Sequence, residues 1–134
     1  MKVFIDSNIP MYVAGREHPN RASAKHFLER VRNGEIEGCT STEVLQEILY
    51  RYSGMRRHDL VANVYELFVQ VCPVVLPITL ADTDVAKDIL CRADGQLTAR
   101  DALHAAVMFN NSLTHIATFD VDFDAIKGIS RFSL

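Results

Sequence analysis

Short apolar runs alternate along this chain with longer segments in which apolar residues recur every three or four positions. The runs at residues 3–5, 74–76 and 115–119 leave almost no polar face, which is typical of short strands buried on both sides of a sheet. Weaker strand patterns lie at residues 36–40 and 129–132. The chain therefore contains several short strands separated by long intervals.

The intervals predict amphipathic helices, because a period near 3.6 residues gathers apolar side chains on one side. A helix over residues 98–110 is apolar in almost every direction and should be central and buried. Another helix is expected from about residue 82 to the neighbourhood of Asp94. The remaining helices are expected at residues 8–13, 22–32, 42–52 and 60–71, and the third of these should bury Val44, Leu45, Ile48, Leu49 and Tyr52.

Strands that alternate with helices form parallel sheets with helices on both faces. We therefore predict one α/β domain spanning residues 1–134, which is a sufficient length for a proper hydrophobic core. In such sheets, ligands bind at the edge where the strands reach their carboxyl ends. Candidate functional residues should therefore follow the strands or begin the helices.

Composition narrows the class of protein further. No apolar run approaches the roughly 18 residues of a membrane span, and no signal peptide is visible. Cys39, Cys72 and Cys91 are widely spaced and odd in number, which indicates reduced, buried cysteines of a cytoplasmic protein. A net charge of −3 argues mildly against a nucleic-acid binder. That argument weakens if the acids are clustered around divalent cations.

Four acids stand where a charge is costly, beside apolar runs or on buried helices. Asp6 follows the first strand, and Asp120 follows the strand at 115–119. Asp101 lies in the first turn of the most apolar helix, and Glu47 borders the apolar stripe of the helix at 42–52. These four residues are our candidates for one acidic site at the carboxyl edge of the sheet.

Each candidate also has an ordinary structural interpretation. Asp6 could be a turn residue, and Asp101 completes a capping-box pattern with Thr98. Glu47 could pair with Arg51 one helical turn later, a contact worth only about 0.2–0.5 kcal/mol. Glu43 competes with Glu47 but lies further from the apolar stripe, while Asp122 and Asp124 blur the choice of Asp120. His104 is expected to be a core or rim histidine rather than a catalytic base.

A pocket of carboxylates without cysteine or clustered histidine selects hard cations, Mg²⁺ or Mn²⁺. Two such ions about 3.5–4 Å apart can activate water and stabilise the leaving oxygen in phosphodiester hydrolysis. The sequence contains no Walker loop and no GxGxxG motif, so nucleotide cofactors are not indicated. Candidate phosphate contacts are the arginines Arg16, Arg51, Arg56, Arg57, Arg92 and Arg100.

Four segments together resemble the PIN domain, specifically the small VapC-type toxin nucleases of bacterial and archaeal toxin–antitoxin pairs. They are Val3-Phe4-Ile5-Asp6-Ser7-Asn8, Val44-Leu45-Gln46-Glu47-Ile48, Ala99-Arg100-Asp101-Ala102-Leu103-His104-Ala105-Ala106 and Ala117-Thr118-Phe119-Asp120-Val121-Asp122-Phe123. The segments occur in the family's order, and the resemblance covers nearly the whole chain.

The resemblance implies a Rossmann-like α/β/α sandwich with a central, five-stranded parallel sheet and Mg²⁺- or Mn²⁺-dependent endoribonuclease activity. By matching position, Asp6, Glu47, Asp101 and Asp120 would be the catalytic, metal-binding acids. Asn8, Thr118 and Asp122 would support them. The family also implies an RNA substrate, a homodimer and an antitoxin that occupies the active-site groove.

Two other functions are compatible with the sequence. One is a Mg²⁺-dependent phosphotransfer or phosphatase domain in which Asp6 is the phosphorylated nucleophile, with Thr118 assisting; no lysine follows at the place such a domain requires. The other is a catalytically silent PIN-like module that binds RNA or protein. Metal affinity separates these alternatives, because a silent module needs no cation.

Overall fold

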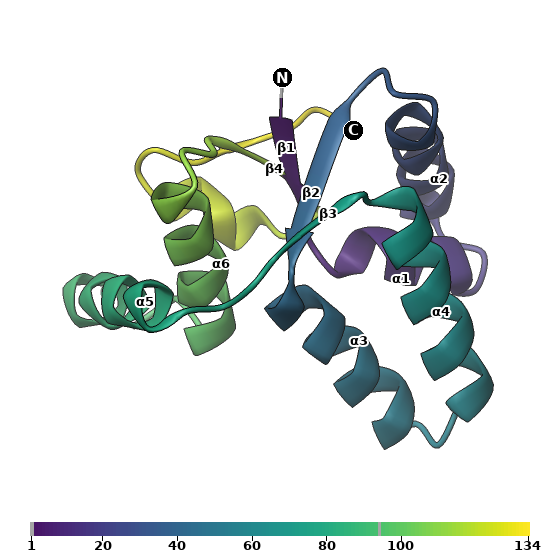
Figure 1. The fold of residues 1–134 in the computed structure, drawn as a ribbon, viewed down its shortest axis with the longest axis horizontal. Helices are drawn as coiled ribbons and strands as arrows, with labels where there is room; N and C mark the ends of the chain where they lie inside the picture. Colours follow the sequence, from purple (N-terminus) through teal and green to yellow (C-terminus); the bar gives the residue numbers. More distant parts are fainter. Residues whose placement is uncertain (1, 94) are drawn as a thin grey trace.

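One parallel sheet organises the protein, as shown by a computed structural model that describes residues 2–93 and 95–134 (Figure 1). Its five strands lie in the order β3-β2-β1-β4-β5, and every neighbouring pair is parallel. The predicted α/β fold with a five-stranded parallel sheet is therefore confirmed. The strands are β1 Lys2–Ile5, β2 Glu37–Ser41, β3 Val74–Leu76, β4 His115–Ala117 and β5 Ser130–Arg131.

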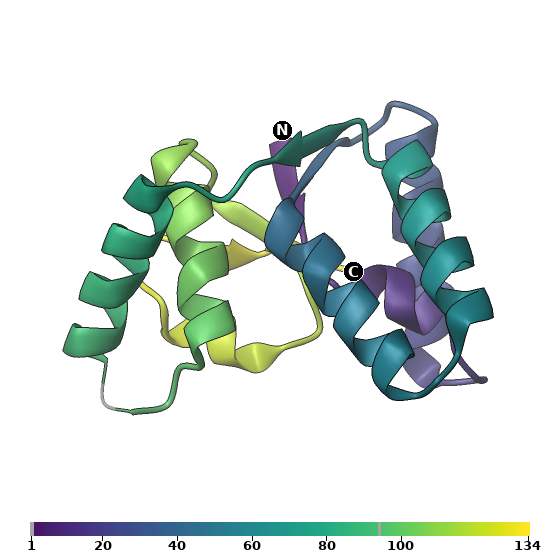
Figure 2. The same ribbon diagram turned by 60° about the horizontal axis from the view of Figure 1, so that its bottom comes forward.

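Helices cover the sheet on both sides. Figures 1 and 2 show α5 and α6 packed together on one side, with α1, α2 and α4 on the other, while α3 extends from the end of β2. Among the described residues, no helix has the length and apolar character needed to cross a membrane. The helices are α1 Asn8–Ala14, α2 Pro19–Arg32, α3 Thr42–Gly54, α4 His58–Val71, α5 Leu80–Arg92 and α6 Ala99–Asn110, and a short 3-10 helix covers Val121–Ala125.

The helix boundaries follow local capping chemistry. Helix α2 begins three residues earlier than predicted, because Pro19 occupies its first turn and the His18 ring accepts a hydrogen bond from the Asn20 backbone N–H. Helix α5 begins at Leu80 because the preceding Thr79 forms a reciprocal capping box with Asp82. It ends at Arg92, and the predicted end near Asp94 lies outside the described residues.

Two burial predictions were wrong. Leu49 is 41% exposed, because it lies at the edge of the apolar stripe of α3, a helix that packs mainly against α4. Cys91 is exposed on α5, whereas Cys39 and Cys72 are buried as predicted. Periodicity locates the centre of an apolar stripe better than its edges, since an edge side chain is buried only where a neighbouring element covers it.

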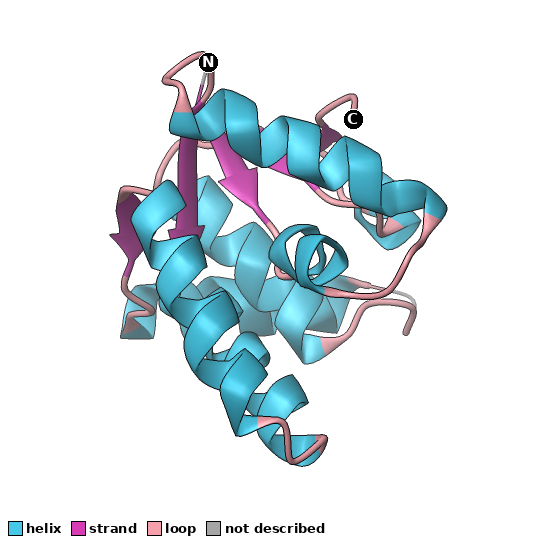
Figure 3. Cartoon of the chain, turned by 90° about the vertical axis from the view of Figure 1, so that its right-hand side faces the viewer, coloured by secondary structure: helices cyan, strands magenta, loops and turns pink. Residues whose placement is uncertain are grey.

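Strand β1 lies at the centre of the sheet and fixes the geometry of its carboxyl edge. Phe4 is fully buried and aligned with Cys39 on β2 and Ile116 on β4. Because the strands run in the same direction, their carboxyl ends meet at one edge (Figure 3). The residues that follow β1, β2 and β4 are thereby brought together.

Candidate active site

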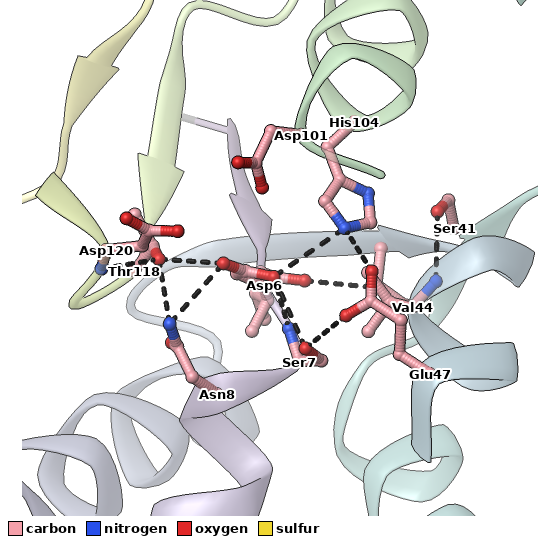
Figure 4. A network of polar contacts seen from close by, with 12 residues as sticks. Asp6, Ser7, Asn8, Ser41, Val44, Glu47, Asp101, His104, Thr118 and Asp120 are labelled. Atoms are coloured by element: carbon pink, nitrogen blue, oxygen red, sulfur yellow. Dashed lines mark hydrogen bonds and ion pairs between the residues drawn. The ribbon is translucent and has the colours of Figure 1, made fainter. Parts of the chain in front are cut away.

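Asp6 lies immediately after β1 and is buried within a set of hydrogen bonds (Figure 4). Its Oδ1 accepts the Ser7 backbone N–H at 2.7 Å. Its Oδ2 accepts the Thr118 hydroxyl at 2.7 Å and the Asn8 amide at 3.4 Å. The Asn8 amide also donates to the Thr118 hydroxyl oxygen at 3.0 Å. These contacts join the ends of β1 and β4 and hold the Asp6 carboxylate in one orientation.

Glu47 reaches the same place from α3, and both of its oxygens have partners. Its Oε1 lies 2.7 Å from His104 Nε2, while its Oε2 accepts the Ser7 hydroxyl. His104 Nε2 also lies 3.7 Å from Asp6 Oδ1. The buried ring of His104 therefore lies between two buried carboxylates. The alternative ion pair between Glu47 and Arg51 does not form among the described residues.

Asp101, Asp120 and Asp122 form a second group of carboxylates beside the first. One oxygen from each lies within 4.8 Å of the others. Asp101 comes from the first turn of α6, where its backbone N–H donates to the Thr98 hydroxyl at 3.1 Å. The Asp120 carboxylate accepts the backbone N–H of Asp122 at 2.9 Å. Figure 4 shows Asp120 beside Thr118, and Asp101 between Asp120 and His104.

The pKa values of these groups reflect burial and mutual repulsion. Burial raises the pKa of Asp6, and the charge of Glu47 adds to that effect. Burial also raises the pKa of Asp101, as do the charges of Asp120 and Asp6. Without a cation, the ionised carboxylates therefore destabilise one another.

Glu47 and His104 behave as a buried ion pair. Burial by itself would raise the pKa of Glu47, but the hydrogen bond and charge of His104 lower that pKa overall. Burial would lower the pKa of His104, but its hydrogen bond with Glu47 and the charge of Asp6 raise it overall. The imidazolium form of the ring is thus stabilised by the carboxylates around it.

The structure brings every predicted site residue to the carboxyl edge of the sheet. It supports Glu47 over Glu43, because Glu47 is buried against Ser7 and His104 whereas Glu43 is partly exposed. The capping role of Thr98 is confirmed, and it coexists with the approach of Asp101 to the other acids.

Sequence reasoning missed two contributors. Ser7 was named only as part of the first segment of the family resemblance, yet it links Asp6 to Glu47. His104 is buried as expected, but it contacts two acids and its Nδ1 has no hydrogen-bond partner among the described residues. A signal was available, because His104 follows Asp101 by three residues and so lies on nearly the same side of α6.

The donor set fits a hard divalent cation. Asp6, Asp101, Asp120 and Asp122 offer carboxylate oxygens, and Thr118 offers a hydroxyl, which are ligands that suit Mg²⁺ and Mn²⁺. Burial is the main cause of the raised pKa of Asp101, and repulsion from Asp120 and Asp6 adds to it; a bound cation would remove that repulsion. The residues that could hold it are Asp6, Asp101, Asp120 and Asp122.

Comparison with known proteins is consistent with this geometry. A model of the PIN domain family matches residues 3–129. Ribonuclease VapC13 of Mycobacterium tuberculosis is 40% identical over 131 residues, which are 98% of this chain and 99% of that protein. Ribonuclease VapC23 of the same species is 36% identical over 118 residues, which are 88% of this chain and 92% of that protein.

Solved structures share the fold. VapBC2 of Rickettsia felis, crystallised with a DNA fragment from its promoter, aligns with a TM-score of 0.77 at 18% identity, covering 98% of both chains. VapC20 of M. tuberculosis, a toxin that cleaves the sarcin–ricin loop, aligns with a TM-score of 0.74 at 22% identity. That alignment covers 92% of this chain and 93% of VapC20.

Proposed function

Because the chain belongs to the PIN domain family, we propose that it is the toxin ribonuclease of a toxin–antitoxin pair and hydrolyses RNA with the help of Mg²⁺ or Mn²⁺. The observation that carries this proposal is the convergence of Asp6, Glu47, Asp101 and Asp120 at one edge of the sheet. The relatives named VapC ribonuclease support the reaction and its substrate class. Carboxylates held together despite their repulsion support the need for a cation.

Asp6, Asp101 and Asp120 would hold the cation, with Asp122 beside them. When bound, Mg²⁺ or Mn²⁺ would neutralise these carboxylates, offset charge on the reacting phosphate and lower the pKa of water. Thr118 and Asn8 orient Asp6 through its Oδ2. The other oxygen, Oδ1, accepts the Ser7 backbone N–H and lies 3.7 Å from His104 Nε2, on the side of Glu47 (Figure 4).

Glu47 would complete the polar shell or orient the attacking water. Ser7 and His104 fix its two oxygens, so the carboxylate needs no reorganisation when the substrate arrives. In the reaction, a water oxygen bonds to phosphorus and one P–O ester bond breaks. The leaving oxygen takes up a proton, so one product ends in a phosphate monoester and the other in a hydroxyl group.

Cleavage of defined RNAs tests this proposal. The purified protein should cut a mixture of single-stranded and structured RNAs in Mg²⁺ or Mn²⁺ and should lose activity in EDTA. Asp6→Asn should abolish cleavage while its circular dichroism spectrum stays unchanged. Asp124→Asn is the control, because Asp124 is exposed and pairs with Arg131 at 2.8 Å, outside both acid groups.

The ends of the products provide a check on contamination. Nucleases that use the RNA 2′-hydroxyl as nucleophile pass through a 2′,3′-cyclic phosphate and work in EDTA. Hydrolysis by water leaves no cyclic phosphate. Equal cutting by the wild type and Asp6→Asn, or cutting that survives EDTA, would overturn the proposed function.

Two partners follow from the family and remain proposals for this chain. A cognate antitoxin is supported by the structural likeness to VapBC complexes, in which toxin and antitoxin are bound together. A homodimer is expected from the family resemblance. Co-purification with the product of a neighbouring gene tests the first partner, and analytical ultracentrifugation of the isolated protein tests the second.

A further inference from the structure

A polar groove leads away from the acidic site along α3. It begins at Ser7 and Glu47, which belong to the site, and continues past Arg51 to Met55 just beyond the end of the helix. Arg100, next to Asp101 in the sequence, lines the groove from α6. Its volume of about 620 Å³ lies within the range of about 300–1,000 Å³ that is typical of ligand sites. A molecule bound in the groove would thus extend directly from the reacting centre.

The charge of this groove differs from that of the chain as a whole, whose net charge is −3. Arg51 and Arg100 are exposed and belong to no ion pair among the described residues. In contrast, Arg57 is paired with Asp59 at 2.9 Å and Arg131 with Asp124 at 2.8 Å. The groove thus presents two guanidinium groups available to an anion.

The groove also carries an aromatic side chain. Tyr50 is 69% exposed and precedes Arg51 on α3. Aromatic rings beside basic residues form typical platforms for single-stranded nucleic acid, because each base can stack and each phosphate can pair with a cation. Gly54 adds no side chain to the groove, and a Cβ at that position would meet no atom within 4 Å.

We propose that this groove binds the single-stranded RNA adjacent to the bond that is cut, with Arg51 and Arg100 contacting phosphates and Tyr50 stacking on a base. This inference rests on the proposed ribonuclease function and adds a location for the substrate. The acids of the site repel RNA unless a cation is bound, whereas Arg100 beside them and Arg51 further along α3 attract it. The acids would therefore serve the chemistry and the arginines the binding of substrate.

The test measures binding separately from cleavage. Fluorescence anisotropy with a labelled single-stranded RNA is recorded at several salt concentrations in Mg²⁺, using proteins that also carry Asp101→Asn to prevent cleavage. In this background we compare Arg51→Gln, Arg100→Gln and the double variant. Arg32→Gln is the matched control, because Arg32 is exposed in the last turn of α2 as Arg51 is in the last turn of α3.

Each phosphate contact on a single strand contributes about 0.7 to the slope of log affinity against log salt. The slope for the double variant should therefore be smaller by about 1.4 than that of the protein with both arginines. Raising the salt from 50 to 200 mM should then weaken RNA binding by a factor about sevenfold smaller in the double variant. Arg32→Gln should leave the slope unchanged. Tyr50→Ala should weaken binding by at least about fivefold, and Tyr50→Phe should retain it. Urea midpoints of all the variants verify that they are folded.

An unchanged slope in the folded double variant would overturn the inference, as would the absence of measurable RNA binding in the parent protein. Dissociation of a dimer by the same substitutions without a change in slope would assign the groove to a second copy of the chain, and would also overturn it. Failure of the ribonuclease function looks different. In that case the wild type cuts no RNA, whatever the salt dependence of binding.

Discussion

Replacing Asp101 by asparagine should stabilise the metal-free protein even though it abolishes activity. Asp101, Asp120 and Asp122 bring carboxylate oxygens within 4.8 Å of one another. At that separation, two unit charges repel by about 0.9 kcal/mol at the dielectric constant of water and by about 3.5 kcal/mol at an effective value of 20. Asp101 is only partly buried and Asp122 is exposed, so the lower figure is the relevant one. We expect Asp101→Asn to increase the free energy of unfolding by about 1–2 kcal/mol.

A divalent cation should reverse this order. Binding to the folded wild type alone stabilises it by about 2.7 kcal/mol when the free cation is at 100 times its Kd. Asp101→Asn lacks one of the proposed ligands and should gain far less. The variant should therefore be the more stable protein in EDTA and the less stable one in saturating Mg²⁺ or Mn²⁺. This crossing distinguishes a metal site from an ordinary capping position.

Urea unfolding followed by circular dichroism, in EDTA and in Mg²⁺, measures both effects. Asp84→Asn is the control, because Asp84 is exposed on α5 and belongs to no ion pair among the described residues. Its two unfolding curves should follow those of the wild type. The reasoning is wrong if Asp101→Asn is no more stable than the wild type in EDTA, or if Mg²⁺ stabilises both proteins equally.

Three further predictions concern the same edge of the sheet and the helix behind it. His104→Leu should lower the free energy of unfolding in EDTA by about 3–5 kcal/mol, because it leaves buried Glu47 unpaired. The double variant that also carries Glu47→Leu should lose less stability than His104→Leu alone. Additive losses in the double-mutant cycle would refute this prediction. Asp82→Ala should lower the free energy of unfolding, measured by thermal denaturation, by about 1–3 kcal/mol, because it removes a capping contact of α5 and the 2.8 Å hydrogen bond from the Asn110 amide. Asp82→Asn should recover part of this loss. In EDTA, the stability gained from Asp101→Asn should depend on pH. It should be complete above the raised pKa of the Asp101 carboxyl in the folded protein, and it should vanish as the pH falls below 3.8, where this carboxyl is protonated in both the folded and the unfolded protein. A stability gain that stays constant in urea unfolding across this pH range would contradict the prediction.

The path of the backbone was largely predictable, because it depends on local patterns. The run at residues 74–76 predicted β3 with correct bounds, and the run at 3–5 predicted β1 to within one residue. Helix beginnings were less predictable. The capping box of Thr79 with Asp82 moved the start of α5 ahead of its apolar pattern, which begins only at Val85.

The site was predictable where an acid followed a strand or bordered a buried stripe. Asp6 and Glu47 were identified in this way, since neither position is suited to an unpaired charge. The partners of those acids could not be found by the same reasoning. The contact of Ser7 with Glu47 and that of His104 with both acids depend on how β1, α3 and α6 meet in space, which periodicity along one element does not encode.

Cation binding and RNA cleavage, measured on the same samples, test the central claim most directly. Electron paramagnetic resonance gives the fraction of bound Mn²⁺ during a titration, and single-turnover cleavage of a labelled RNA gives the rate at each point. We predict that the rate rises in proportion to bound Mn²⁺ in the wild type, and that Asp101→Asn loses both signals. Cleavage at an unchanged rate before any Mn²⁺ is bound, or full binding and cleavage in the variant, would contradict the account.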